Sequence, residues 1–120
     1  MRLKNFLLVV RNIERSKAFY KELFGMTIVR DFGENVILDE GLVLQEEKTW
    51  ETAVGQQIFY GSHNTELYFE EPDWDSFLEK LKQSSFPIEY LNEETESSWG
   101  NRMVRIYDPD KHILEIREVT

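Results

Sequence analysis

Residues 3–10 read LKNFLLVV and residues 66–69 read ELYF, and these two apolar runs decide the fold. Each run has the composition of a strand, and each is followed by a short amphipathic helix pattern and then by further strand patterns. A repeated order of elements indicates two copies of one structural unit. Half of a small chain cannot bury a core alone, so the two copies must pack together. The sequence therefore predicts two βαβββ modules, an α+β fold, with any site lying where the modules meet.

Local signals place one helix in each half. Asn12 can cap a first helix, and Gly25 follows its last apolar residue as a left-handed stop. Asp73 can cap a second helix, which carries apolar residues from Trp74 to Leu81 at offsets of three, four and seven. Strands are expected near Lys4–Val10, Met26–Arg30, Val36–Leu38, Leu42–Gln45, Glu66–Glu70, Ile88–Leu91, Met103–Tyr107 and Ile113–Arg117.

The length of 120 residues predicts a single domain. We expect module one at about residues 1–47, a linker at about residues 48–64 and module two at about residues 65–120. The polar run at residues 92–98 is typical of a solvated loop inserted in the second copy.

Composition excludes several classes of function. The chain has 14 basic and 23 acidic residues, a net charge of −9, which repels nucleic acid and anionic membrane surfaces. It has no cysteine, so disulfides, thiolate metal sites and a cysteine nucleophile are excluded. The first apolar run is too short for a signal peptide or a membrane span, and we expect a cytoplasmic protein.

Alternation of side chains along the strands predicts which polar groups face the interior. Leu114 and Ile116 are expected on the helix side of the last strand, which turns Glu115 to the other side. The same reasoning turns a set of polar residues inward, namely Asn5, Gln45, Glu66, Arg105, Tyr107 and Glu115. A carboxylate in an enclosed space must be paired, coordinated or protonated. Arg105 can neutralise Glu115 if the last two strands are in the appropriate register.

The segments NFLLVVRNIERSKAFYKELFG (residues 5–25) and NRMVRIYDPDKHILEI (residues 101–116) carry a family resemblance. They are similar to the first strand and helix, and to the closing hairpin, of the vicinal oxygen chelate superfamily, the glyoxalase/bleomycin resistance/extradiol dioxygenase group. This resemblance implies that the two modules form an open curved barrel with one helix outside each. It also implies a homodimer and a small-molecule ligand in the cleft between the modules.

The resemblance places the metal positions of the superfamily on Asn5, Gln45, Glu66 and Glu115. Histidine is usual at the first and third of these positions and is absent from both, which excludes the iron dioxygenases. Because these nitrogen ligands are missing, we expect no cofactor. The remaining oxygen donors suit hard ions, so a divalent metal (Mg²⁺, Mn²⁺ or Ni²⁺) is kept as the alternative.

The two histidines are expected to lie outside the site. His63 is read as a surface or loop residue, because its offset of three from Glu66 points it to the opposite face of an extended chain. His112 follows the turn at residues 108–111 and is expected to make a hydrogen bond within it.

Aromatic residues supply the other signal for a site, since small-molecule pockets combine rings with a few polar groups. The expected ligand-binding residues are Trp50, Tyr60, Tyr68, Trp99, Arg105 and Tyr107.

Three functions remain open. The favoured one is a glyoxalase/bleomycin resistance-like protein that binds a small molecule without a tightly bound transition metal. The second is a divalent-metal-dependent lyase or isomerase of the glyoxalase type, with Glu66 and Glu115 as catalytic residues. The third is a partner-binding domain with a vestigial cleft. Whether the protein is an enzyme is left open.

Overall fold

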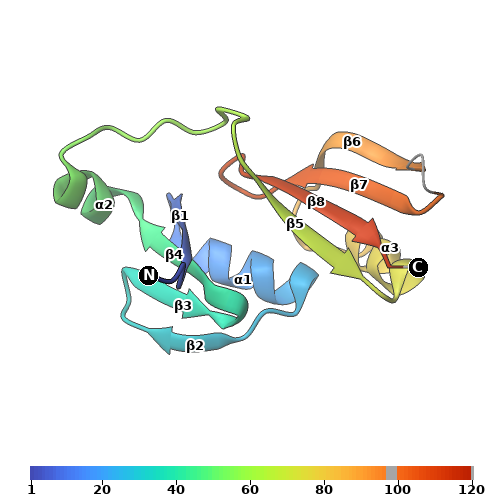
Figure 1. Cartoon of the computed structure of the whole chain (residues 1–120), viewed down its shortest axis with the longest axis horizontal. Helices are drawn as coiled ribbons and strands as arrows, with labels where there is room; N and C mark the ends of the chain where they lie inside the picture. Colours follow the sequence, from blue (N-terminus) through green and yellow to red (C-terminus); the bar gives the residue numbers. More distant parts are fainter. Residues whose placement is uncertain (97–99, 120) are drawn as a thin grey trace. The chain divides into compact units, whose positions relative to one another are not determined.

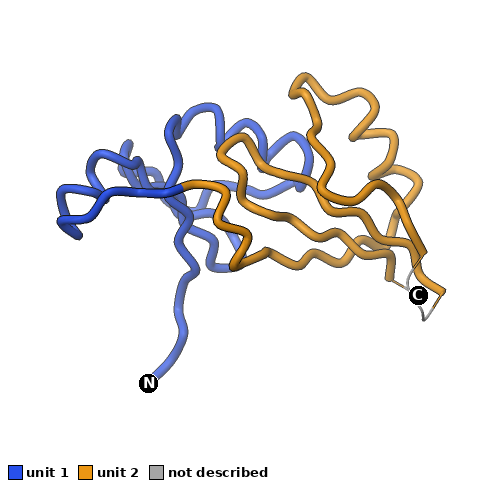
Figure 2. Tube along the Cα trace, turned by 90° about the horizontal axis from the view of Figure 1, so that it is seen from above, with its two compact units in different colours: residues 1–59 blue, residues 60–120 orange. Residues whose placement is uncertain are grey.

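Each half of the chain folds into a four-stranded sheet with the same strand order, as the repeated pattern predicts (Figure 1). The computed structural model describes residues 1–96 and 100–119. The chain divides into two compact units, residues 1–59 and residues 60–120 (Figure 2). The boundary falls within the expected linker, and the predicted α+β fold of two βαβββ modules is confirmed.

The first unit has the sheet order β1-β4-β3-β2. Strand β1 runs parallel to β4, and the other pairs are antiparallel. The elements of the unit are β1 (Phe6–Val10), α1 (Ile13–Phe24), β2 (Ile28–Asp31), β3 (Asn35–Leu38), the 3₁₀ turn η1 (Asp39–Gly41), β4 (Leu42–Glu46) and α2 (Glu47–Val54).

Helix α1 begins and ends where its capping residues predict. The Asn12 side chain accepts a hydrogen bond from the Arg15 backbone N–H at 3.0 Å, and Gly25 closes the helix with a φ of 63°. The helix buries Ile13, Phe19, Tyr20 and Leu23. One apolar stripe therefore attaches α1 to its sheet.

The second unit repeats this topology with the sheet order β5-β8-β7-β6. Its elements are β5 (Glu66–Glu71), α3 (Trp74–Lys82), β6 (Glu89–Glu96), β7 (Arg102–Tyr107) and β8 (Ile113–Glu118). Asp73 caps α3 by accepting from the Ser76 N–H at 3.2 Å, and the helix buries Trp74, Phe77 and Leu81.

The core of each unit lies between its sheet and its helix. In the second unit Val104, Ile106, Leu114 and Ile116 are each 0–1% exposed, and they alternate with residues of the opposite face. In the first unit the equivalent buried positions are Leu8, Val10, Val36, Leu38, Leu42 and Leu44. The candidate polar residues lie on the opposite face of each sheet, among further apolar side chains.

Two segments differ from the sequence predictions. The linker contains the helix α2, which the apolar pattern did not predict, because it buries none of its residues. The Glu46 side chain caps α2 through the N–H groups of Lys48 and Thr49, and Gly55 ends it with a φ of 73°.

The expected loop at residues 92–98 was wrong over residues 92–96, which continue the strand β6. All eight residues of β6 are exposed, and pairing with β7 on one side supplies its hydrogen bonds. Charged side chains are tolerated on such an edge strand, so polarity alone does not distinguish it from a loop. Residues 97 and 98 lie outside the described residues.

Among the described residues, the helices are all too short or too polar to cross a membrane.

Candidate functional site

The strand register of the second unit brings a group of charged and aromatic side chains onto the face of the sheet opposite α3. Glu115 of β8 lies between Tyr68 of β5 and Arg105 of β7, and Arg117 lies between Glu70 and Met103. Directly opposed residues of neighbouring strands share one face. We call this surface the polar face, and it consists of Glu66, Tyr68, Glu70, Met103, Arg105, Tyr107, Ile113, Glu115 and Arg117.

Glu115 is the most deeply placed charge on the polar face, with a side chain that is only 4% exposed. Its Oε1 accepts a hydrogen bond from Arg105 Nη2 at 2.5 Å. Its Oε2 accepts from Arg117 Nη2 at 3.2 Å and from Arg117 Nε at 3.3 Å. Both carboxylate oxygens therefore have a guanidinium partner, as a buried carboxylate requires.

Arg105 joins Glu115 to two further residues. Its Nε donates to Glu66 Oε1 at 3.1 Å, and its Nη1 donates to Asn92 Oδ1 at 2.9 Å. The Arg105 guanidinium thus bridges Glu66 and Glu115, the two carboxylates that the alternation of side chains predicts on one face of the sheet. This arrangement fixes the Arg105 side chain through three of its nitrogen atoms.

The end of the polar face nearest the β7–β8 turn is built around Tyr107. His63 Nε2 lies 2.6 Å from the Tyr107 hydroxyl, and Lys111 Nζ lies 4.7 Å from the centre of the Tyr107 ring. Lys111 also pairs with Glu89. His63 and Lys111 have positive φ angles of 60° and 70°, a conformation that costs free energy in residues other than glycine.

The expectation that His63 points to the opposite face was wrong, because its positive φ turns the chain before β5 begins. His63 is exposed, as predicted for a surface residue.

The prediction for His112 is confirmed. Its Nδ1 lies 2.7 Å from Asp108 Oδ2, and its backbone N–H donates to Asp108 Oδ1 at 2.9 Å. Tyr60, an expected ligand-binding residue, lies with its ring edge-on to the His112 ring at 6.2 Å. Tyr60 therefore packs at the β7–β8 turn.

The other two expected metal positions lie in the first unit, where both amides have protein partners. Asn5 Nδ2 donates to the Gly41 carbonyl at 3.2 Å. Gln45 Oε1 accepts from Asn35 Nδ2 at 2.7 Å, and Gln45 Nε2 donates to Thr49 Oγ1 at 2.6 Å. We call the face of this sheet opposite α1 the amide face, defined by Leu7, Val9, Asn35, Ile37, Val43 and Gln45.

Two expected ligand-binding aromatic residues remain, Trp50 and Trp99. Trp50 lies in α2 of the first unit and is half-buried. Trp99 lies outside the described residues.

The superfamily resemblance implies a divalent metal at Glu66 and Glu115, where an arginine lies instead. Arg105 contacts both Glu66 and Glu115, so a cation shared by these carboxylates would have to displace the guanidinium. The described part of the chain contains no group of three or more His, Cys, Asp or Glu side chains that could hold a metal ion. Arg105 thus occupies the place that a metal ion shared by these carboxylates would need.

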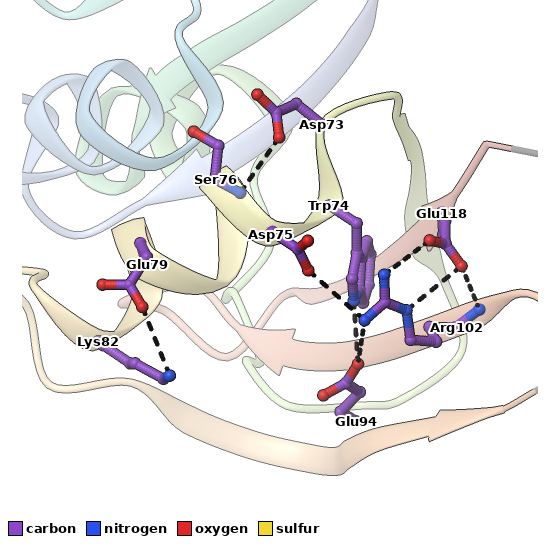
Figure 3. A network of polar contacts seen from close by, with 9 residues as sticks. All are labelled: Asp73, Trp74, Asp75, Ser76, Glu79, Lys82, Glu94, Arg102 and Glu118. Atoms are coloured by element: carbon purple, nitrogen blue, oxygen red, sulfur yellow. Dashed lines mark hydrogen bonds and ion pairs between the residues drawn. The ribbon is translucent and has the colours of Figure 1, made fainter.

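A second charged network lies on the opposite, helix side of the same sheet (Figure 3). Arg102 pairs with Glu118 at 2.8 Å and lies over the Trp74 ring, while Trp74 Nε1 donates to Glu94 at 3.0 Å. The hydrogen bond to Arg102 lowers the pKa of Glu118, and the same bond raises the pKa of Arg102. This network connects α3 to β6, β7 and β8 and so supports the sheet that carries the polar face.

Sequence reasoning did not find two side chains that contact the polar face, Asn92 and His63. Alternation turned Arg117 to the same side as Glu115, but it was not expected as a partner of that carboxylate. Asn92 was assigned to the loop that proved to be β6. The position of His63 depends on a positive φ that no local sequence signal indicates.

Residues 3–120 match a family model described as a glyoxalase-like domain. The fold is similar to the crystal structure of a protein of unknown function from Agrobacterium tumefaciens str. C58, with 33% identity over 100% of this chain and 95% of that chain and a TM-score of 0.86. It is also similar to a glyoxalase-related enzyme from Fulvimarina pelagi, with 21% identity over 98% and 88% of the chains and a TM-score of 0.82. Lactoylglutathione lyase from Agrobacterium tumefaciens gives 21% identity over 98% and 92% of the chains and a TM-score of 0.69. No curated protein matches the sequence.

Proposed function

Since the chain belongs to the glyoxalase-like domain family, we propose that it binds a small molecule on the polar face without a tightly bound transition metal. One observation carries this proposal: both oxygens of Glu115, the family-equivalent metal position in β8, are engaged by Arg105 and Arg117. A carboxylate neutralised in this way needs no cation.

The rest of the polar face supports a role in binding. Tyr68 is 52% exposed, and the Arg105 side chain is 30% exposed although it is held by three partners. Rings beside fixed polar groups are the usual composition of a small-molecule site. Because Arg105 and Arg117 are fixed by Glu115, they can orient a ligand at little entropic cost.

Metal analysis is the test of this proposal. Protein purified without chelator is assayed for bound metals and then titrated calorimetrically with Mn²⁺ and with Ni²⁺. We expect no stoichiometric metal and no saturable one-to-one binding. Glu118→Gln is the matched control for Glu115→Gln, because Glu118 lies on the same strand and is also paired with an arginine, but on the other face.

The second candidate is a metal-dependent lyase or isomerase that uses Glu66 and Glu115 to move a proton. The observation in its favour is that Arg105 bridges these two carboxylates, so both approach one point on the face. One equivalent of nickel, zinc or manganese in the wild-type protein, lost in Glu115→Gln and kept in Glu118→Gln, would replace the binding proposal with this one.

A further inference from the structure

We infer that the ligand of the polar face is a small organic amine with an aromatic or apolar body, and that its ammonium group binds at Glu66. This inference rests on the proposed function and adds the chemical class of the ligand. It is carried by the charges, the rings and the row of side chains around Glu66.

The charges of the polar face leave a carboxylate oxygen available. The polar face carries two guanidinium groups, Arg105 and Arg117, and three carboxylates, Glu66, Glu70 and Glu115, so its net charge is negative. Lys111 is paired with Glu89. Glu66 receives one hydrogen bond, from Arg105 to Oε1, and its Oε2 has no partner among the described residues. The Glu66 side chain is 37% exposed, so a ligand can reach this oxygen from solvent.

The aromatic rings of this surface already contact cations. The Arg117 guanidinium lies 5.8 Å from the centre of the Tyr68 ring, and Lys111 lies 4.7 Å from that of Tyr107. These distances are typical of cation–π contacts, which are strongest where water is partly excluded. Tyr68 follows Glu66 by two residues on β5 and faces the same side, so an amine held at Glu66 would have an aromatic surface beside it.

Glu66 and Tyr107 also lie in one row across the sheet, with Ile113 between them. Neighbouring strands are about 4.8 Å apart, which separates the two Cα atoms by roughly 10 Å above an apolar residue. The Tyr107 oxygen uses either its hydrogen or one lone pair in the bond to His63, so at least one lone pair can accept from a ligand N–H. The row thus offers two acceptors and an apolar floor.

The overall charge favours the same class of ligand. A net charge of −9 raises the local concentration of cations around the protein and repels small anions. A carboxylate ligand on the polar face would also meet the free oxygen of Glu66 and the exposed Glu70.

Three probes of similar shape distinguish a cationic, a neutral and an anionic ligand: benzylammonium, benzyl alcohol and benzoate. Binding is followed by changes in backbone amide shifts of the ¹⁵N-labelled full chain, which give both the location and the affinity. We expect benzylammonium to bind most tightly, with shifts centred on residues 66–68, and benzoate to bind least. Glu66→Gln should weaken benzylammonium at least about tenfold, since hydrogen bonds to charged groups contribute about 1.5–3 kcal/mol and 1.4 kcal/mol is tenfold.

Two variants complete the experiment. Glu71→Gln removes a carboxylate of the same strand on the other face of the sheet and should leave benzylammonium affinity unchanged within about twofold. Tyr107→Phe should weaken benzylammonium by about three- to tenfold, because it deletes the second acceptor. The amide spectrum of each variant shows directly whether it is folded.

Equal or tighter binding of benzoate or benzyl alcohol on this face would overturn the amine inference and leave the proposed function standing. Absence of shifts with all three probes would also overturn the amine inference. Failure of the proposed function has its own signature, stoichiometric metal bound through Glu115.

Discussion

The amide face and the polar face occupy equivalent sheets but hold different chemistry. Both sheets pair their first and last strands in parallel and place an apolar layer against one helix. On the amide face, Gln45 bonds to Asn35 at 2.7 Å and to Thr49 at 2.6 Å, and these groups are neutral. On the polar face, Glu115 is held by two guanidinium groups. The repeat thus preserves the backbone and the core, while function depends on the side chains of the face opposite the helix.

The contrast predicts different sensitivities of the two faces to mutation. A neutral amide network loses one or two hydrogen bonds when a member is removed, whereas a buried charge that loses its partners remains in a site of low polarity. The stability of the second unit should therefore depend on its arginines more strongly than that of the first unit depends on its amides.

The largest effect is expected from the double substitution Arg105→Ala with Arg117→Ala. It leaves the Glu115 carboxylate, whose side chain is 4% exposed, without a charged partner. The free energy of unfolding should fall by about 3–5 kcal/mol. Each single substitution leaves one guanidinium and should cost less, about 1–3 kcal/mol. Urea unfolding measures all three. A double variant that loses under about 1 kcal/mol would show that Glu115 is not a buried charge dependent on these arginines.

A smaller effect is expected on the amide face. Gln45→Leu removes the hydrogen bonds to Asn35 and Thr49 in a half-buried position, and should cost about 0.5–1.5 kcal/mol. The same urea experiment compares it with the arginine variants. If Gln45→Leu proved as costly as the double arginine substitution, the distinction between a neutral and a charged face would not govern stability.

The smallest effect is expected at Glu118, where the paired side chains of Arg102 and Glu118 are 39% and 24% exposed. Because Arg102 lowers the pKa of Glu118 in the folded protein, the pair stabilises the fold above the ordinary carboxyl pKa of 4.5. That contribution is lost as the pH falls through the lowered pKa. Thermal melting should show Glu118→Gln slightly less stable than wild type at neutral pH, with the difference disappearing in acid. A difference that grows in acid would contradict the direction of the shift.

Much of the fold could be predicted from local signals. Asn12, Gly25 and Asp73 mark the helix ends because their backbone geometry and side-chain acceptors act locally. Alternation likewise placed Glu115 and Arg105 on one face, since both strands contain buried apolar neighbours that set the phase.

The features that escaped prediction lack such local signals. Helix α2 buries no residue, and β6 exposes all of its residues, so neither has an apolar pattern. The approach of His63 to Tyr107 joins residues 44 positions apart through a positive φ. Which side chains pair on the polar face depends on the register between neighbouring strands. The amino-acid pattern of a single strand does not determine that register.

The central claim is that arginines, and not a metal ion, neutralise Glu115. The most direct test is anomalous diffraction at the manganese absorption edge from crystals grown with excess Mn²⁺. We expect no manganese peak bonded to Glu115, and an Arg105 guanidinium that still contacts the Glu115 Oε1. A manganese peak within about 2.0–2.6 Å of an oxygen of Glu115 or Glu66, with Arg105 displaced from both, would contradict it.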